Sequence, residues 1–508
     1  MRTNAVSGLG LFALCALVAC STETVIRQTD APTDPASQDG TDDGTTDDGT
    51  DPGQTSDTDP ETPSGPLVKG VTLKDIAVYQ GVKVLVVSGG KWVSSRNAPV
   101  VAGRVALVRV FVSTDSSYDG STVTAELRLT TGGKKLPILK DTKKVSTAST
   151  DTDTKTTFNF EVPADQLDRD TSFSVALTSP NGDDPTSTSA SPARFPQDGT
   201  TKSLAAEASG KVKVVLVPVK YMADGSGRQP DVTQTQLDLY KQTMMSMYPA
   251  TSVEITVHAP YQYTNGIAAN GSGWSSVLQS ITNLRQADRA PSDVYYYGAF
   301  APTSSFNTYC GGGCVTGLST VVDTASTSYL RASVGIGFSG IDAAKTMAHE
   351  VGHAHGREHA PCGGADSPDE NFPYTGGTIG VWGYDIFAKT LLSPTKGHDV
   401  MGYCENSWVS DYTYSALFDR ISALNPTTTK SQQTGGNALR TYRVATVAAD
   451  GALSYENEVE LADLTGGTEV PSVQGARFYK FDHLPGGVLM LPKSAITTSI
   501  TRIDMNAR

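Results

Sequence analysis

The sequence predicts a multi-domain protein with an N-terminal all-β sandwich, a central α/β domain and a small C-terminal β-rich domain. Three observations support this prediction. The chain has 508 residues, which is more than one hydrophobic core usually serves. Short alternating apolar segments recur over residues 67–200, as they do in strands. Over residues 210–426, strand-like segments alternate with amphipathic helical ones, which is typical of a mixed α/β layer.

The first twenty residues are typical of a signal peptide. In residues 1–20, "MRTNAVSGLGLFALCALVAC", Arg2 precedes an apolar run that is too short to span a bilayer. The run ends in Leu-Val-Ala-Cys20, which resembles the lipobox of bacterial lipoproteins. This resemblance implies an exported chain, lipid-anchored to the cell envelope through Cys20. Because Ser21 rather than Asp follows, it favours the outer membrane. An ordinary signal peptide with an incidental cysteine is the alternative.

Residues 21–66 predict a disordered acidic tether rich in Thr, Asp, Gly and Pro. The segment has almost no apolar side chains, so it cannot bury enough surface to offset its conformational entropy. It carries ten Asp and two Glu against one Arg, and therefore most of the net charge of −13. The remainder of the chain is nearly neutral and has no basic stripe, which argues against a nucleic-acid partner.

The sandwich is expected over residues 67–200. Segments such as "KVLVVSG" and "VALVRVFVS" alternate and are separated by turn residues at intervals typical of antiparallel sheets. No titratable residues cluster there, so we expect a spacer or a binding module. The C-terminal region, residues 437–508, reads as a small β-rich domain whose function the sequence does not give.

The central domain is expected over residues 210–426. "KVKVVLVPV" reads as a buried strand, and "QTQLDLYKQTMMSMYP" after it as an amphipathic helix. Short strands are also expected at "STVVDT" and "SVGIGFSG", and a last helix begins at about Asp411.

A histidine-rich stretch, "AHEVGHAHGREHA", lies in the central domain and holds four of the chain's seven histidines. We expect a helix here that ends at Gly356. His349 and His353 are four residues apart, so both imidazoles project from one helix face and can meet one ion. Gly356 permits the left-handed backbone that ends a helix, and His359 can then return to complete the site. Three protein ligands leave the fourth position of a zinc ion open for water, which Glu350 can reach.

The stretch matches H-E-x-x-H-x-x-G-x-x-H, the signature of the metzincin metallopeptidases. His349, Glu350, His353, Gly356 and His359 fill it without a gap. This resemblance implies a metzincin-like zinc endopeptidase that hydrolyses protein or glycoprotein substrates, with one catalytic zinc ion and Glu350 as general base.

Two further residues extend the resemblance. Metzincins carry a methionine-containing turn below the metal, and Met401 in "HDVMGYC" matches it. Tyr403 follows at the spacing of astacins and serralysins, which implies that it stabilises the oxyanion. The region is also similar to bacterial exported enzymes of the mucin-cleaving, StcE-like type. Ala360 and Pro361, directly after the third histidine, match none of the well-known subfamilies.

Export would leave four cysteines in an oxidising compartment, where an even number favours disulfides. Three pairings are possible, and we favour Cys310 with Cys314 and Cys362 with Cys404. A zinc site made of thiolates is the alternative, although the C-x-x-C spacing is missing.

Several neighbouring residues are weaker candidates. His355 points away from His353 on the helix, so we do not expect it to bind the metal. His398 and Asp399 could orient a ligand through hydrogen bonds. The acidic loop residues Asp366, Asp369 and Glu370 could bind calcium.

Two other functions compete with the metzincin prediction. One is a gluzincin-like peptidase in which Glu370 is the third metal ligand. The other is a surface-binding lipoprotein, such as an adhesin, whose metal site is vestigial. The intact Glu350 argues against the second, because a degenerate site has no chemical reason to keep its base.

Overall fold

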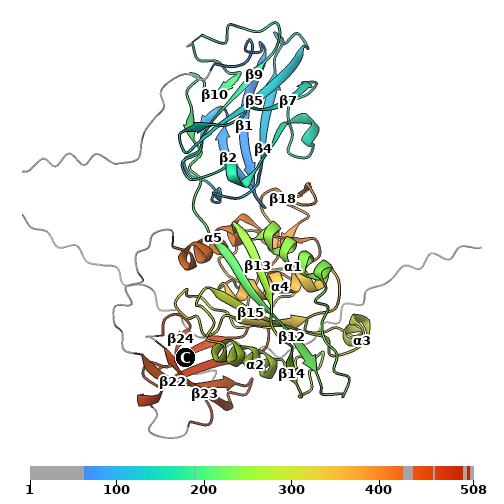
Figure 1. The fold of residues 1–508 in the computed structure, drawn as a ribbon, viewed down its shortest axis with the longest axis vertical. Coiled ribbons are helices and arrows are strands. Elements are labelled where there is room, and N and C mark those ends of the chain that lie inside the picture. Colours follow the sequence, from blue (N-terminus) through green and yellow to red (C-terminus); the bar gives the residue numbers. More distant parts are fainter. Residues whose placement is uncertain (1–61, 188, 427–438, 462–463, 496–499, 504–508) are drawn as a thin grey trace, which may run out of the picture.

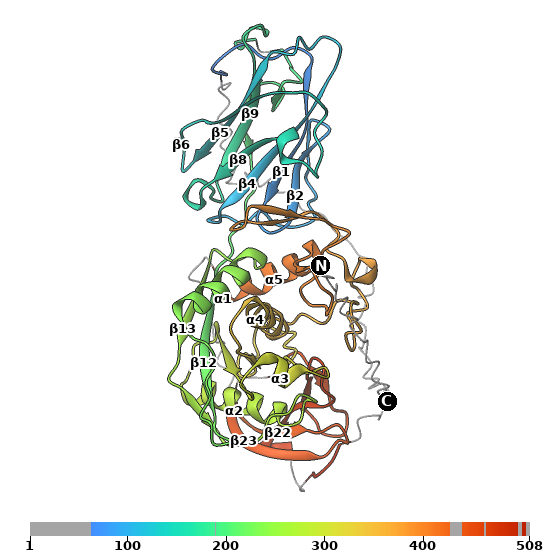
Figure 2. The ribbon, with the colours of Figure 1, turned by 90° about the vertical axis from the view of Figure 1, so that its right-hand side faces the viewer.

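The computed structural model describes residues 62–187, 189–426, 439–461, 464–495 and 500–503 (Figures 1 and 2). The predicted signal peptide, Cys20 and the acidic tether lie outside these residues. The described chain is mostly β, with few helices and several separate sheets, which confirms the coarse fold prediction. The domain boundaries themselves remain predictions. None of the helices in the described ranges is long and apolar enough to cross a membrane.

Residues 67–203 form two antiparallel sheets that face each other at one end of the molecule (Figure 1). Val123, Leu127 and Val175 turn toward the shared core between the sheets, because alternate residues of a strand face the same side. The first sheet has the order β3-β2-β1-β4-β8, from β1 (Val71–Tyr79), β2 (Lys83–Ser88), β3 (Lys91–Trp92), β4 (Ala106–Thr114) and β8 (Phe158–Val162). The second contains β5 (Thr122–Thr131), β6 (Lys134–Lys135), β7 (Leu139–Lys144), β9 (Ser172–Thr178), β10 (Arg194–Phe195) and β11 (Lys202–Ser203), and the connections include η1 (Thr154–Thr156) and η2 (Ala164–Gln166).

The central sheet has the order β13-β12-β15-β17-β16, and β14 pairs with the far end of β12. Its strands are parallel except β16, which pairs antiparallel with β17 and forms one edge. The strands are β12 (Lys211–Tyr221), β13 (Ser252–Val257), β14 (Tyr261–Tyr263), β15 (Val294–Phe300), β16 (Gly317–Ser319) and β17 (Ala332–Ile336).

Helices cover both faces of this sheet (Figure 2). Alternate residues of β15 reach opposite layers: Tyr295 and Tyr297 pack in the core with α1 and α4, whereas Tyr296 and Phe300 pack in the core with α2. The helices of the described chain are α1 (Gln234–Met247), α2 (Trp274–Ala287), α3 (Phe306–Cys310), α4 (Ile341–Ala354) and α5 (Asp411–Leu424).

The long connection between α4 and α5 contains η3 (Thr375–Gly377) and two small sheets. These are the antiparallel pair β18 (Gly383–Asp385) and β19 (Thr390–Leu392), and the parallel pair β20 (His398–Asp399) and β21 (Ser407–Trp408). Tyr384 of β18 packs against Tyr79 and Phe111, so this connection also contacts the N-terminal sandwich.

The C-terminal residues form a sheet with the order β23-β22-β26-β25-β24. Tyr442, Tyr479 and Met490 of this sheet are buried in the same core as α2, so the sheet packs directly on the central layer. Its strands are β22 (Arg440–Val447), β23 (Leu453–Leu461), β24 (Thr468–Glu469), β25 (Arg477–Lys480) and β26 (Gly487–Pro492), followed by η4 (Lys493–Ala495).

Candidate active site

Helix α4 carries His349, Glu350 and His353, and all three side chains are buried. The helix is rich in alanine and contains no proline, which favours helix formation. His349 and His353 lie one turn apart on the same face, as predicted, and their ring centroids are 4.7 Å apart.

The chain reverses at Gly356 directly after α4. Gly356 has a φ of +89°, a conformation that strains other residues, and a Cβ there would lie 2.7 Å from the carbonyl oxygen of Val322. The reversal brings His359 back to the helix, where its ring centroid lies 4.6 Å from that of His353 and 5.4 Å from that of His349. The structure therefore brings the three predicted imidazoles together.

Each of these imidazoles is held by one nitrogen and presents the other to the site. The Nδ1 atoms of His349, His353 and His359 lie 2.7, 2.6 and 2.8 Å from the backbone carbonyl oxygens of Val400, Arg357 and Asp366, respectively. A carbonyl oxygen only accepts, so each Nδ1 must carry the ring proton. Burial lowers the pKa of all three histidines, in His349 to about 4, and the mutual proximity of the rings contributes to this shift for His349 and His353. The rings are therefore neutral, and each Nε2 carries a lone pair directed at the site.

The lone pairs of these three Nε2 atoms fit a metal ion. The Nε2 atoms of His349 and His353 are only 3.0 Å apart, although neither has a proton to donate to the other. Nitrogen ligands at about 2.0–2.1 Å in a tetrahedral zinc site lie roughly 3.3 Å from one another. The imidazoles also belong to a group of potential ligand atoms that all lie within 4.8 Å of one another. Their arrangement is therefore that of a donor set around one cation.

The sequence prediction missed two residues of this site, Asp482 and His483, which lie in the loop after β25. The carboxylate of Asp482 is the fourth member of the group that contains the three imidazoles. Its Oδ2 atom lies 3.6 Å from Nε2 of His353 and 2.7 Å from Nδ1 of His483. The only signal in the sequence was an Asp-His pair about 120 residues from the signature, and nothing local indicates where it folds.

Glu350 lies beside the imidazoles, against the edge strand β16. A Cβ on Gly317 would lie 2.1 Å from its Oε1 atom, so the carboxylate occupies the space that this glycine leaves open. The Oε2 atom is buried and has no hydrogen-bond donor among the described residues. Burial, together with the neighbouring carboxylate of Asp482, raises the pKa of Glu350 well above its ordinary value.

Asp482 shows the opposite shift. Burial alone would raise its pKa, but the nearby His483, His353 and His359 outweigh that effect and lower it. The carboxyl groups of Glu350 and Asp482 lie beside each other in one group of potential ligand atoms. The raised pKa of Glu350 and the contact of Asp482 with His483 at 2.7 Å reduce the repulsion between them.

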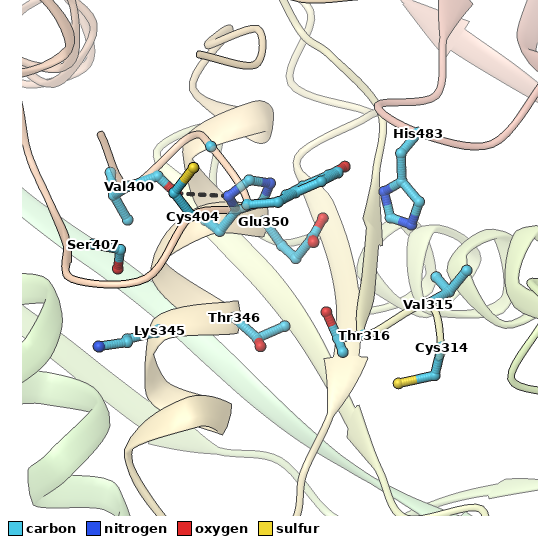
Figure 3. Close-up of a pocket in the computed structure, with 13 residues that line it drawn as sticks. Cys314, Val315, Thr316, Lys345, Thr346, Glu350, Val400, Cys404, Ser407 and His483 are labelled. Atoms are coloured by element: carbon cyan, nitrogen blue, oxygen red, sulfur yellow. Dashed lines mark hydrogen bonds between the residues drawn. The ribbon is translucent and has the colours of Figure 1, made fainter. Parts of the chain in front are cut away.

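Glu350 and His483 both point into a pocket of about 420 Å³ (Figure 3). Val315 and Thr316, just before β16, line it on one side, and Ser407 lines it on another. Tyr403 is also among the residues that line the pocket. The candidate site is thus open to an approaching molecule beside the edge of the central sheet.

Met401 and Tyr403 lie where the resemblance expects them. Met401 is buried below α4, and its sulfur lies 2.6 Å from the place where a Cβ on Gly352 would be. The Tyr403 hydroxyl lies 2.8 Å from Nε2 of His359, so it donates a hydrogen bond to that lone pair. Partial burial of the phenol, with Asp482 and Glu350 nearby, raises the pKa of Tyr403, although the whole residue is 43% exposed.

Both favoured disulfides are formed. Cys310 is bonded to Cys314 across the "CGGGC" loop, and Cys362 to Cys404. The second bond ties the loop after His359 to the turn that carries Tyr403. Because all four cysteines of the described chain are paired, none provides a thiolate for the alternative zinc site.

The remaining candidates lie apart from the three imidazoles. His355 stacks on Tyr295 at 4.1 Å, which agrees with the expectation that it does not bind the metal. His398 is bonded through Nδ1 to the carbonyl oxygen of Glu405. Asp399 is buried and accepts hydrogen bonds from the backbone N–H groups of Met401 and Ser410 at 2.8 and 2.9 Å, so it shapes the methionine turn.

The acidic loop does not form a cluster of ligands in the described structure. The carboxylate of Asp369 accepts hydrogen bonds from Arg357 and Tyr412. Glu370 is exposed and is absent from the groups of potential ligands found among the described residues, as is Asp366. Neither the calcium site nor Glu370 as third ligand gains support.

Residues 324–430 match the Peptidase M66 family. The matched segment contains the three imidazoles, Glu350, Met401 and Tyr403, and the match supports a metallopeptidase that acts on polypeptides. It covers about a fifth of the chain and leaves out Asp482 and His483. No curated protein matches the sequence.

Similarity to solved structures is weak. The crystal structure of metalloproteinase-II from Bacteroides fragilis has 12% identity and a TM-score of 0.25, over 67% of this chain and 87% of that chain. A calcium binding mutant of Bacteroides uniformis beta-glucuronidase 2 has 10% identity and a TM-score of 0.13, over 48% of this chain and 25% of that chain. TM-scores this low do not establish a shared fold.

Proposed function

We propose that this chain is a zinc-dependent endopeptidase of the metzincin type, in which His349, His353 and His359 bind the ion. The observation that carries the proposal is the convergence of three Nε2 lone pairs, each fixed by an Nδ1 bond to a backbone carbonyl. Three neutral imidazoles are a ligand set that suits zinc. When bound, the ion supplies the Lewis acidity that activates water and polarises the scissile carbonyl group.

Glu350 is the general base in this proposal. Its carboxylate lies next to the imidazoles and has an oxygen without a hydrogen-bond donor, so it can accept a proton from an attacking water. In this role the carboxylate takes the proton from the attacking water and passes it to the leaving amine.

Tyr403 is the second catalytic side chain. Its hydroxyl is a hydrogen-bond donor that already points at the imidazole group. With Nε2 of His359 engaged by the ion, the O–H group is free to turn to the oxyanion that forms on the scissile carbonyl.

The edge strand β16 supports an extended polypeptide as substrate. β16 is the outermost strand of the central sheet and lies directly beside Glu350. A peptide that adds to such an edge is held by backbone hydrogen bonds, which places its carbonyl groups near the catalytic side chains. We extend this to protein or glycoprotein substrates of the StcE-like type, met at the cell envelope where Cys20 would anchor the chain.

The proposal is tested by Glu350→Gln. This change keeps the size of the side chain but removes the base, so we expect peptide hydrolysis to fall by about 10²–10⁴-fold while the protein retains one metal ion. Hydrolysis of a quenched fluorescent peptide library and metal content are measured on the same samples, with and without a chelator.

Glu370→Gln is the matched control. Because Glu370 is exposed and apart from the imidazoles, this variant should keep both metal and activity. Undiminished hydrolysis in Glu350→Gln would refute Glu350 as the base. Loss of metal in Glu370→Gln would instead favour the gluzincin-like alternative.

A further inference from the structure

The segment Lys480–His483 of the C-terminal region crosses the candidate site. It leaves β25 and runs antiparallel to Ser319–Val321, the continuation of the edge strand β16. The backbone N–H of Val321 donates to the carbonyl oxygen of Lys480 at 3.1 Å, and that of Asp482 donates to Ser319 at 3.2 Å. The C-terminal segment therefore adds to the edge of the central sheet as a short extra strand.

This pairing fixes the position of the Asp482 side chain. Oδ1 of Asp482 accepts a hydrogen bond from the backbone N–H of Ser319 at 3.0 Å, and Oδ2 accepts one from Nδ1 of His483 at 2.7 Å. The residue is 5% exposed. The carboxylate is thus held from both sides next to the imidazole group, with Oδ2 3.6 Å from Nε2 of His353.

The contact between Asp482 and His353 is not an ordinary ion pair. Nδ1 of His353 uses the ring proton for the carbonyl oxygen of Arg357, so Nε2 has none to donate. Two acceptor atoms, Oδ2 of Asp482 and Nε2 of His353, therefore face each other at 3.6 Å. A carboxylate oxygen of Asp482 also belongs to a group of potential ligand atoms with Glu350 and His483. Acceptors converge in this way around a cation.

We propose that Asp482 is a fourth protein ligand of the metal ion, supplied by the C-terminal segment. This inference rests on the proposed metal site. A catalytic zinc site keeps one position open, whereas four protein ligands close it. Asp482 thus occupies the position that the attacking water needs, and Lys480–His483 acts as an inhibitor built into the chain.

Release of the inhibitor follows from the same contacts. The segment is held by two backbone hydrogen bonds to Ser319–Val321, by the hydrogen bond from Ser319 to the Asp482 side chain and by the buried side chain of Phe481. An ion pair between Lys480 and Glu358 at 2.6 Å, whose side chains are both partly exposed, adds to these contacts. Surface ion pairs contribute little to stability. A polypeptide that pairs with the edge strand would compete with the segment and displace Asp482.

The experiment uses the full chain loaded with Co²⁺, whose visible spectrum reports its ligands, and compares wild type with Asp482→Asn. Asparagine keeps the size of the side chain and the acceptor for Ser319 but lacks the anionic ligand. We expect Asp482→Asn to bind Co²⁺ at least about tenfold more weakly in competition with a chelator. We also expect added acetohydroxamate to change the Co²⁺ spectrum of this variant at concentrations that leave the wild type unchanged.

Asp450→Asn is the matched control. Asp450 lies in an exposed turn of the same C-terminal sheet and forms an ion pair with Arg502. In the described structure it is not part of the group of potential metal ligands that contains the imidazoles. This variant should match the wild type in affinity and spectrum. Equal Co²⁺ affinity in wild type and Asp482→Asn, or an equal response to acetohydroxamate, overturns Asp482 as a ligand.

Peptide hydrolysis separates this inference from the proposed function. If both hold, Asp482→Asn with zinc cleaves a short peptide at least about tenfold faster than the wild type, because the water position is open. If the Co²⁺ results hold but neither protein cleaves any peptide, Asp482 stands as a ligand and the endopeptidase proposal fails. Equal cleavage by both proteins overturns the inhibitory role.

Discussion

Each of the three site histidines bonds a backbone carbonyl oxygen through Nδ1 and directs Nε2 into the candidate site. The spacing of His349, His353 and His359 was sufficient to predict that the rings meet, because a helix and a glycine turn fix their relation locally. The backbone carbonyls that hold Nδ1 could not be predicted in the same way. Val400, for example, lies 51 residues from His349, and only the tertiary fold brings its carbonyl oxygen to the ring.

The position of Asp482 could be predicted from the sequence even less than the carbonyl partners of the histidines. Its contacts depend on how the C-terminal sheet packs against α2 and β16, and no periodicity around "KFDHL" reports that packing. A lone Asp-His pair is common in proteins and predicts no site.

Gly317 provides a test of the position of Glu350. In Gly317→Ala the new Cβ would lie 2.1 Å from Oε1 of Glu350, so the carboxylate must leave its observed position. We expect peptide hydrolysis to fall by about a hundredfold, since displacing a catalytic group by 1 Å can cost this much, while metal content stays at one ion. Steady-state kinetics and metal analysis measure the two effects.

Gly266→Ala is the control for this glycine substitution. A Cβ on Gly266 meets no atom within 4 Å, so the change should be silent in both measurements. Normal hydrolysis in Gly317→Ala would mean that Glu350 does not need its observed position.

His355 makes the stability of the metal-free protein depend on pH. Burial, with Arg420 and Arg331 nearby, lowers the pKa of His355 to about 3, whereas an exposed histidine has about 6.5. Between these values the unfolded chain binds the extra proton and the folded chain does not, so stability falls as the pH falls. From pH 7 to pH 5 this residue alone should remove about 2 kcal/mol from the free energy of unfolding.

His355→Phe isolates this contribution. Phenylalanine preserves the stacking on Tyr295. It loses the hydrogen bond from Nδ1 of His355 to the carbonyl oxygen of Val351, which lowers stability at both pH values, so only the difference between pH 7 and pH 5 is compared. Urea unfolding of metal-free wild type and variant at pH 7 and pH 5 should show a smaller loss in the variant. The other histidines titrate in both proteins, so an identical loss would contradict the assignment.

The elements around the site were predicted unevenly. Helix α4 was expected from its motif and is found at Ile341–Ala354, ending just before the glycine turn. "STVVDT" was expected to be a short strand, but β16 ends at Ser319, and Thr320 forms only an isolated bridge to the C-terminal segment. The residues from Val321 to Thr324 are not in a strand, because their neighbour is the short Lys480–His483 segment, whose position the sequence does not indicate.

The disulfide Cys362–Cys404 connects two of these elements and should matter more than Cys310–Cys314. It closes a loop with a sequence separation of 42 residues, against 4 for the other bond. Chain entropy predicts a loss of about 4 kcal/mol when Cys362 and Cys404 are replaced by alanine, against about 2 kcal/mol for the other pair. Only the first replacement frees the loop after His359, so only it should weaken metal binding.

Chemical denaturation and chelator competition measure these two effects, and the Cys310/Cys314 double variant serves as the matched control. Equal metal affinity in the Cys362/Cys404 double variant and the wild type would show that the bond does not position the site.

Across the whole molecule, the N-terminal sandwich is joined to the central layer more closely than a spacer would be. Arg104 of the sandwich is fully buried. It donates hydrogen bonds to the carbonyl oxygen of Met245, near the end of α1, and to that of Ala250, just after this helix. Nε1 of Trp408 in turn donates to the carbonyl oxygen of Gly81 in the sandwich at 2.8 Å. The composition of residues 67–200 gave no sign of this contact, because a single buried arginine is indistinguishable from a surface one in the sequence.

Arg104→Met should loosen this junction. The substitution leaves buried carbonyl oxygens without a donor, at about 1–3 kcal/mol for each group. We expect calorimetry to show one cooperative transition in the wild type and a separate, earlier transition in the variant. Arg96→Met is the control, since Arg96 donates to the carbonyl oxygens of Leu204 and Ala205, directly after β11, rather than to residues of α1. A single unchanged transition in Arg104→Met would contradict the proposed coupling.

The most direct measurement is the anomalous difference map of a crystal of the zinc-loaded wild type, collected at the zinc absorption edge. We predict one strong peak within about 2.1 Å of the Nε2 atoms of His349, His353 and His359. A map without a peak there, or with the ion held by other residues, would contradict the assignment of these imidazoles as the metal site.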